Sequence, residues 1–298
     1  MKRCLIAVAV VSMCAAGAAQ TDPVAMVREA EKVIASGDVA GGVAQLEKIV
    51  ASAPKSFEAR LALGRALDLE GRHRPARQHL EEALTVASEV QRNTALLSLG
   101  TSYAFESKAD EAARYYQRAF DAEMQADDRS GAAGVANALG RVYLESGNLK
   151  KAEEWYTTGY ETARKIPGLP EADTTLWEMR RHNAFGRIAA RRGDKAAADQ
   201  HAAAVKSVLD KGLNDNQRAF YPYLLGYIAF FAKDYQRAID ELMKGDLNDP
   251  FVLGLIAQSH EKLRHRDLAA EYYKKVIAMP SHSINSAFAR PLARKFLR

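Results

Sequence analysis

The chain has little of several residue types that mark particular protein classes. It contains two cysteines in 298 residues, Cys4 and Cys14, only 9 prolines, and 8% aromatic residues. The remaining composition, 48% apolar and 27% charged, is that of an ordinary globular protein and excludes a collagen-like or largely disordered chain. The formal charge of +5 is too small to indicate a nucleic-acid partner by itself.

The first 19 residues are typical of a secretory signal peptide. Lys2 and Arg3 give the segment a positive start, and an apolar stretch covers residues 5–13. Small residues follow, ending at Ala19, and they provide a cleavage site. The apolar stretch is shorter than the roughly 20 residues of a membrane-spanning helix. We therefore predict cleavage near Ala19 and a periplasmic or secreted protein, with a retained anchor as the alternative.

Cleavage at this point would remove both cysteines. The mature chain would then have no disulfide, no catalytic thiol and no cysteine-ligated metal. The residues before Cys14 resemble a bacterial lipoprotein signal, but Met13 stands where that pattern has Gly or Ala. We therefore expect no lipid on Cys14.

A Leu-Gly or Phe-Gly pair recurs five times, with 36, 40, 46 and 40 residues between successive glycines. Twelve residues after each glycine there is an alanine. Glycine has no Cβ, so a second helix can approach its backbone closely, and the small alanine allows the same approach from the other side. A glycine inside a helix costs about 1 kcal/mol relative to alanine, which packing must exceed. The glycines are Gly64, Gly100, Gly140, Gly186 and Gly226, and the alanines are Ala76, Ala112, Ala152, Ala198 and Ala238.

This pattern resembles the tetratricopeptide repeat, a helix–turn–helix unit of about 34 residues. The clearest copies begin near Arg60, Leu96 and Ala136, and weaker copies cover 26–54 and 253–279. The resemblance implies an all-α fold: a right-handed α-solenoid of about seven repeats with a C-terminal capping helix. The predicted segments are a signal peptide at 1–19, a solenoid at 22–280 with units near 22–55, 56–91, 92–131, 132–177, 178–217, 218–249 and 250–280, and a basic cap or tail at 281–298.

Two stretches, 121–134 and 162–175, make the repeat spacing longer than the family norm. We expect them to lengthen second helices or the connections between repeats. Pro167 and Pro170 predict a loop in the later stretch. The short Gly131-Ala-Ala-Gly134 segment is interpreted as an inter-repeat connection.

The sequence contains no convincing signature of an enzyme or of a metal site. His260-Glu261 and His265 look like a zinc-protease motif, but that motif spaces its histidines four apart on one helix face, and these are five apart. No glycine-rich phosphate loop ending in Gly-Lys-Ser/Thr occurs. The sequence therefore predicts no catalytic residues, no metal and no cofactor.

Candidate binding residues come from the expected first helices, which line the concave face of stacked repeats. One repeat carries arginines nearly in register, and the next carries an aromatic stripe. Arginine and aromatic side chains together are typical of a peptide groove. The alternative is that the aromatics pack between repeats and the arginines are solvated. The ten residues are Asn137, Arg141, Arg180, Asn183, Arg187, Arg191, Tyr223, Tyr227, Phe230 and Phe231.

These observations predict a non-catalytic protein- or peptide-binding scaffold or adaptor in the bacterial cell envelope, whose partner carries acidic and aromatic groups. One alternative is a periplasmic binder of a small anionic solute at Arg180, Arg187 and Arg191. Another is an enzyme without a known motif. Export makes a nucleic-acid partner unexpected, and membrane contact is expected only through an uncleaved signal or the basic tail.

Some members of the family bind a C-terminal carboxylate through a Lys/Asn/Arg clamp. Asn137 and Arg141 resemble its first pair, but Ala184, Phe220 and Leu224 occupy later clamp positions. The resemblance therefore does not imply that function.

Overall fold

The computed structural model describes residues 22–298. The predicted signal peptide, with Cys4, Cys14 and the cleavage site at Ala19, lies outside the described residues. Within 22–298 the chain forms fifteen α-helices, one short 3-10 helix and no strand. The predicted all-α fold is confirmed.

Fourteen of these helices form seven consecutive pairs, followed by a single helix. The pairs are α1 (Pro23–Ala35) with α2 (Val39–Ser52), α3 (Phe57–Glu70) with α4 (His73–Val86), α5 (Glu89–Phe105) with α6 (Ala109–Gln125), α7 (Arg129–Glu145) with α8 (Leu149–Ala163), α9 (Glu171–Arg192) with α10 (Lys195–Leu209), α11 (Phe220–Phe231) with α12 (Tyr235–Leu242), and α13 (Pro250–Lys262) with α14 (Arg266–Ala278). The 3-10 helix η1 (Asp215–Gln217) precedes α11, and α15 (Ile284–Leu297) ends the chain.

Local capping determines where many of these helices begin and end. Asp38 accepts a hydrogen bond from the Gly41 backbone N at 2.8 Å at the start of α2. Asn148 caps α8 in the same way. Gly71 and Gly193 end α3 and α9 with φ values of +82° and +75°, a left-handed conformation that glycine adopts without a Cβ clash.

The repeated glycines lie where the two helices of a pair are closest. A Cβ placed on Gly64 would lie 2.6 Å from the Leu80 side chain and 2.9 Å from the Ala76 carbonyl oxygen. A Cβ on Gly140 would lie 2.8 Å from the ring of Tyr156. All five alanines twelve residues later are fully buried. The predicted close approach of paired helices is confirmed at Gly64, Gly100, Gly140 and Gly226, whereas a Cβ on Gly186 would come closest to Leu224 of the next pair, at 3.1 Å.

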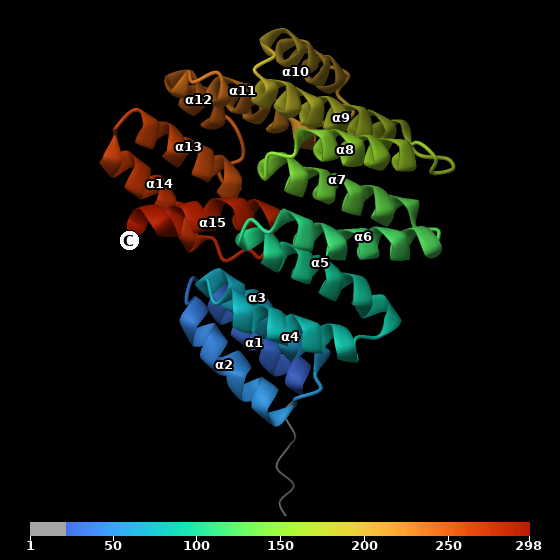
Figure 1. Cartoon of the computed structure of the whole chain (residues 1–298), viewed down its shortest axis with the longest axis vertical. Coiled ribbons are helices and arrows are strands. Elements are labelled where there is room, and N and C mark those ends of the chain that lie inside the picture. The colour runs from blue at the N-terminus through green and yellow to red at the C-terminus, as the bar shows by residue number, and fades with distance from the viewer. Residues whose placement is uncertain (1–21) are drawn as a thin grey trace, which may run out of the picture.

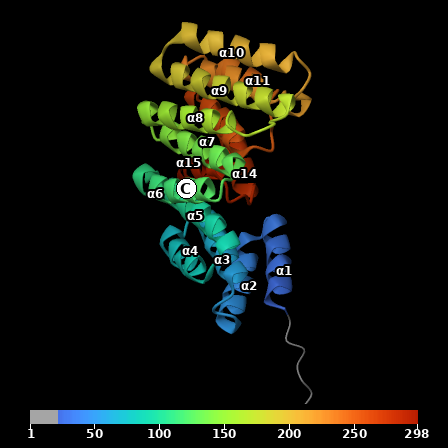
Figure 2. The same ribbon diagram turned by 90° about the vertical axis from the view of Figure 1, so that its right-hand side faces the viewer.

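The pairs stack into a superhelix whose C-terminal helix folds back onto its earlier pairs. Figure 1 shows the chain rising from α1 and α2 to α10 and returning through α11 to α14, so that α15 lies beside α5. Figure 2 shows the stack from the side, with α1 and α2 at one end and α9 to α11 at the other. The helix α15 packs on α13 and α14, as a capping helix does, and also on α5 and α7.

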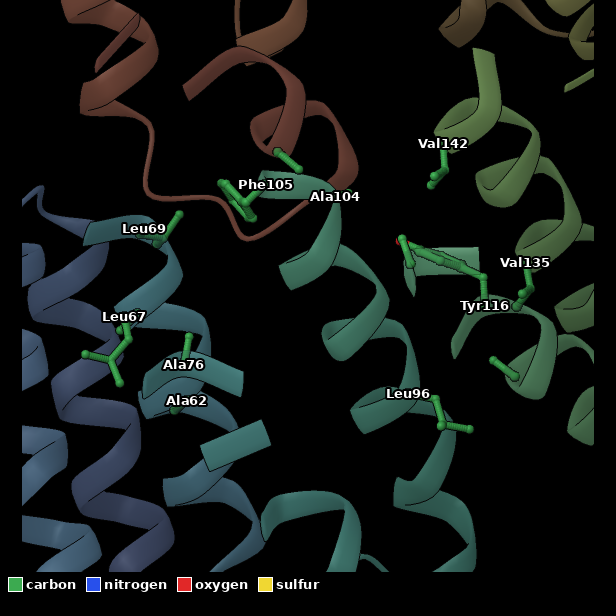
Figure 3. Packing of buried hydrophobic residues seen from close by; sticks show 14 of the residues in the cluster. Ala62, Leu67, Leu69, Ala76, Leu96, Ala104, Phe105, Tyr116, Val135 and Val142 are labelled. Carbon is green, nitrogen blue, oxygen red and sulfur yellow. The ribbon is translucent and has the colours of Figure 1, made fainter. Parts of the chain in front are cut away.

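The hydrophobic core follows the stack as two large clusters, one mainly from α1 to α9 and one from α9 to α15, with two smaller clusters beside them. Figure 3 shows Leu67 and Ala76 within one pair, and Leu96 and Tyr116 in the next. Phe105, at the end of α5, also belongs to this core, and its ring lies 5.6 Å from that of His282 just before α15. The C-terminal segment is therefore part of the packed structure.

Several predicted boundaries are wrong. Unit boundaries at 92, 132 and 178 lie inside α5, α7 and α9, because these helices begin earlier than the repeat pattern suggested. The segment Gly131–Gly134 is part of α7, since Asp128 caps the helix three residues before Gly131, so it is not an inter-repeat connection. The loop predicted from the two prolines is present between α8 and α9. No helix within 22–298 has the length and apolar character needed to cross a membrane.

Candidate binding site

The first helices of the pairs line the inner face of the superhelix, and α15 rests against part of that face. None of the ten predicted binding residues is fully exposed. Six are partly buried: Asn137, Arg141, Arg180, Arg191, Phe230 and Phe231. Four are buried: Asn183, Arg187, Tyr223 and Tyr227. The predicted open groove is therefore largely filled, and nine of the ten residues line two separate cavities.

The first cavity, which we call the arginine cavity, has a volume of about 330 Å³. Residues from five helices, α7, α8, α9, α11 and α15, surround it, so it forms only in the complete superhelix. Its lining consists of Gly134, Asn137, Ala138, Arg141, Tyr156, Met179, Arg180, Asn183, Arg187, Phe220, Tyr223, Ile284 and Asn285.

The second, which we call the aromatic cavity, has a volume of about 260 Å³ and lies between α11, α13 and α15. Arg191 lies over the ring of Phe231 at 4.8 Å, and the rings of Phe230 and Phe231 are 5.3 Å apart. Its lining consists of Ser107, Glu145, Arg191, Phe230, Phe231, Phe251, Leu255, Gln258, Ala287, Phe288, Pro291 and Leu292.

A buried ion-pair network separates the two cavities, with Glu145 at its centre. Arg141 forms an ion pair with Glu145 at 3.1 Å, and Arg191 forms another with the opposite carboxylate oxygen. Tyr227 donates a hydrogen bond to Glu145 at 3.4 Å and accepts one from Arg191 at 2.8 Å. Burial raises the pKa of Tyr227 well above its usual value, and the Glu145 carboxylate adds to that increase.

Arg187 is buried without a carboxylate partner among the described residues. Its Nη2 donates a hydrogen bond to the Tyr156 hydroxyl at 3.1 Å, and its Nε donates to the Asn183 carbonyl oxygen at 3.4 Å. The guanidinium carbon lies 5.6 Å from the centre of the Tyr156 ring, and 5.9 Å from those of Tyr223 and Tyr227. The hydrogen-bond acceptors and rings that contact this positive charge are therefore neutral, and the charged neighbour that acts on it is another cation, Arg141.

The aromatic residues predicted to form a stripe on α11 have different surroundings: some pack in the core, and others line the two cavities. Tyr227 packs internally against Phe231, at 4.7 Å between ring centres, and against Phe251. Tyr223 also contacts Phe251, but it lines the arginine cavity as well, and its hydroxyl is buried without a hydrogen-bond partner among the described residues. Internal packing between repeats was the sequence-based alternative to a binding groove. Tyr227 follows this alternative, because it is buried in the core.

A third polar cluster ties the C-terminal segment to the second helix pair. Asp68 is buried and contacts His73 and His282, each at 2.9 Å, and accepts a hydrogen bond from Ser102 at 3.0 Å. Burial opposes ionisation of Asp68, but the hydrogen bonds from His282, His73 and Ser102 outweigh it and hold the pKa below its usual value.

Sequence reasoning missed several residues of these sites. Glu145 lies four residues after Arg141 on the same helix face, so its position was available from spacing alone. Tyr156 lies sixteen residues after Gly140, as Leu80 does after Gly64, and this offset marks the side chain that faces the glycine. No local signal connects His282 with Asp68, because that contact depends on how the whole superhelix closes.

Four histidines form two close pairs, one of which contains His260 and His265 noted in the sequence. His260 and His265 approach to 3.5 Å, and His182 and His201 to 3.0 Å. Burial lowers the pKa values of His182 and His201, and their positive neighbours add to that effect. In the part of the chain that the structure describes, no three His, Cys, Asp or Glu side chains are placed to share a metal ion.

Three tetratricopeptide repeat family models match this chain, at residues 28–90, 91–165 and 252–281. No curated protein matches it at the level of sequence. Among solved structures, a tetratricopeptide repeat protein from Parabacteroides merdae is 13% identical, with a TM-score of 0.54, and the alignment covers 92% of this chain and 97% of that one.

Two further solved structures are similar. PilW, described as a widely conserved type IV pilus biogenesis factor, is 15% identical with a TM-score of 0.51, over 74% of this chain and 91% of that one. A chain of the APC/C hetero-tetramer Cut9-Hcn1 is 20% identical with a TM-score of 0.47, over 92% of this chain. This chain spans about half of the length of that relative, 49%.

Proposed function

The chain belongs to the tetratricopeptide repeat family, and on that premise we propose that it is a non-catalytic protein- or peptide-binding scaffold of the bacterial cell envelope. Repeat superhelices characteristically bind partners along their extended inner surface. The observation that carries the proposal is that six of the ten predicted residues, three at each cavity, keep part of their surface exposed on this face.

The chemistry of the inner face favours a partner with acidic and aromatic groups. Arg180 is partly exposed and stacks on Trp177 at 4.8 Å, which leaves its guanidinium edge free for a carboxylate. Phe220 is 42% exposed at the rim of the arginine cavity and offers an apolar contact. Arginine and aromatic anchors of this kind supply much of the binding energy in protein interfaces.

The envelope location rests on the N-terminal segment, with its basic start, short apolar stretch and small-residue cleavage site. The scaffold role and the envelope location are independent of each other, so each is tested by its own measurement.

Crosslinking in living cells tests the partner. A photo-reactive amino acid at Phe220 should give a discrete protein adduct, whereas the same probe at the exposed Glu154 of α8 should not. Tyr227 is unsuitable for the probe because it is fully buried. Replacing Arg180 with Glu should weaken the adduct several-fold, since it reverses the charge offered to an acidic partner.

Two results would count against this proposal. Identical adducts from both probe positions would mean that the inner face has no privileged role, and the absence of any adduct would remove the scaffold hypothesis. The intact mass of the recovered protein gives the second readout. A chain that begins at Gln20 supports export, whereas an uncleaved chain in the cytoplasm refutes the envelope location alone.

A further inference from the structure

Buried polar atoms without partners gather at the arginine cavity. Within residues 22–298, eight buried side-chain nitrogen or oxygen atoms make no hydrogen bond, and four of them belong to Arg141, Arg187 and Tyr223. Arg141 Nε still lies 3.1 Å from Glu145 in the ion pair, so the atoms with neither partner are Nη2 of Arg141, Nη1 of Arg187 and the hydroxyl of Tyr223. All three residues line this one cavity. Native proteins satisfy the large majority of such atoms, so this concentration at one place calls for a physical reason.

The most exceptional of these atoms is Nη1 of Arg187. The residue is 5% exposed, and its other guanidinium contacts are with neutral oxygens and with three tyrosine rings. Cation–π contacts recover part of the lost hydration of the charge. They do not supply a hydrogen-bond acceptor, and a buried charge is rarely stable without a paired opposite charge.

The lining of the cavity carries an excess of positive charge. Arg141, Arg180 and Arg187 line it, and no carboxylate belongs to its lining among the described residues. Glu145 pairs with Arg141 through one carboxylate oxygen, and both acids near Arg141 have further partners. Glu145 also pairs with Arg191, and Asp249 accepts hydrogen bonds at 2.7 Å from both Asn285 Nδ2 and the Phe251 backbone N.

We propose that the arginine cavity binds a small organic anion, whose oxyanion group is held by Arg141, Arg187 and the hydroxyl of Tyr223. Two guanidinium groups and a hydroxyl donor match the acceptor oxygens of a carboxylate or a phosphate. The site goes beyond the scaffold role, because it needs no protein partner. It also differs from an arginine row at positions 180, 187 and 191, because Arg191 is paired with Glu145 on the far side of the ion-pair network.

The rest of the cavity limits the class of ligand. A volume of about 330 Å³ has room for on the order of ten water-sized groups and lies at the lower end of small-molecule sites. Met179 and Ile284 offer apolar contacts. The amides that can bond a hydroxyl or carbonyl of the ligand are those of Asn137, Asn183 and Asn285. A compact metabolite-sized acid therefore fits, and a folded segment does not.

Thermal unfolding and calorimetry with defined probes test this site. The probes are succinate, inorganic phosphate and the neutral analogue succinamide, at constant ionic strength. We expect succinate or phosphate to raise the melting temperature in a concentration-dependent way and succinamide to leave it unchanged. A response to succinate alone assigns a carboxylate ligand, and a response to phosphate alone assigns a phosphate ligand.

Tyr223→Phe is the decisive variant because its hydroxyl has no partner within the described chain. The variant should fold as stably as the parent, yet bind the responding anion about tenfold more weakly. Arg187→Met should abolish binding. Arg192→Met, on the same helix but exposed and paired with Glu153, should bind normally.

Three outcomes would overturn the proposal. The first is that neither anion stabilises the parent more than succinamide does. The second is that Tyr223→Phe binds as tightly as the parent. The third is that Arg192→Met loses as much affinity as Tyr223→Phe, which would indicate diffuse attraction to positive charge. Because Tyr223→Phe retains the fold, the proposal stays testable even if Arg187→Met does not fold.

Discussion

At the scale of single residues, the absence of a Cβ decides how closely two helices pack. Gly64, Gly140 and Gly226 each face a bulky side chain of the second helix, and an added Cβ would approach that side chain to 2.5–2.8 Å. The helix penalty of these glycines is offset by the contact that they permit. The same residue type has no such role at Gly134, where an added Cβ meets nothing within 4 Å.

Gly140→Leu should therefore lower the free energy of unfolding by about 1–3 kcal/mol, because the larger side chain overpacks the contact with Tyr156. Gly134→Ala on the same helix is the control, and it should raise that free energy by about 0.5–1 kcal/mol through helix propensity. Urea unfolding followed by circular dichroism measures both. If Gly140→Leu unfolds like the parent, close approach is not the reason for the repeated glycines.

At the scale of elements, α15 binds the C-terminal ends of two other helices, α14 and α3, through one arginine. Arg290 donates hydrogen bonds to the Ile277 and Met279 carbonyl oxygens at the end of α14, at 2.9 and 2.8 Å, and to the Leu69 carbonyl oxygen at the end of α3, at 2.9 Å. The carbonyls at a helix C-terminus lack partners within the helix and carry partial negative charge, so a guanidinium suits both ends. Burial, together with the charge of Arg294, lowers the pKa of Arg290 to about 10.

Arg290→Met should reduce stability by about 1.5–3 kcal/mol, because several carbonyls lose a charged donor at once. Lys295→Met, at an exposed position of the same helix, should change stability little. Parallel urea titrations of the two variants make the comparison. Equal, small effects would mean that α15 is held by its apolar contacts alone and that the buried arginine contributes nothing.

At the scale of the whole molecule, contacts between distant parts of the sequence close the superhelix. His282 reaches Asp68 across 214 positions, and the ring of Phe105 lies between His73 and His282, within 5.6 Å of both. The inner face is consequently partly filled by the chain itself. A protein partner would therefore contact the side chains that stay partly exposed at the two cavities, and it would not enter an empty groove.

The pH dependence of stability tests this closure. The folded pKa of Asp68 is depressed, so its stabilising contribution is present above the unfolded value of about 3.9 and is lost as pH falls through the folded value. Asp68→Asn should be less stable than the parent at neutral pH, and the difference should shrink on acidification below about pH 4. Asp240→Asn, at an exposed position, is the control.

Chemical unfolding at several pH values supplies the measurement. A difference between the parent and Asp68→Asn that stays constant with pH would contradict the assignment of the Asp68 carboxylate as the anchor. A difference that shrinks equally in Asp240→Asn would point to general charge effects instead.

The repeat architecture was predictable because its causes are local. Helical periodicity, the repeated Gly and Ala offsets and the turn residues all act within a single unit, and a solenoid repeats that unit. Boundaries at 92, 132 and 178 were less predictable, because helix ends depend on capping, and the repeat pattern does not record the caps at Ser88 and Asp128.

The sequence by itself determined that the chain forms paired helices, that the pairs stack, and which helix faces point inward, since spacing and side-chain size settle these questions. Only the tertiary structure decided that the stack closes on itself, that α15 occupies part of the inner face, and that Arg187 is buried without a carboxylate partner in the described chain. These features depend on the small rotation between successive pairs summed over seven units, and no local pattern encodes that sum.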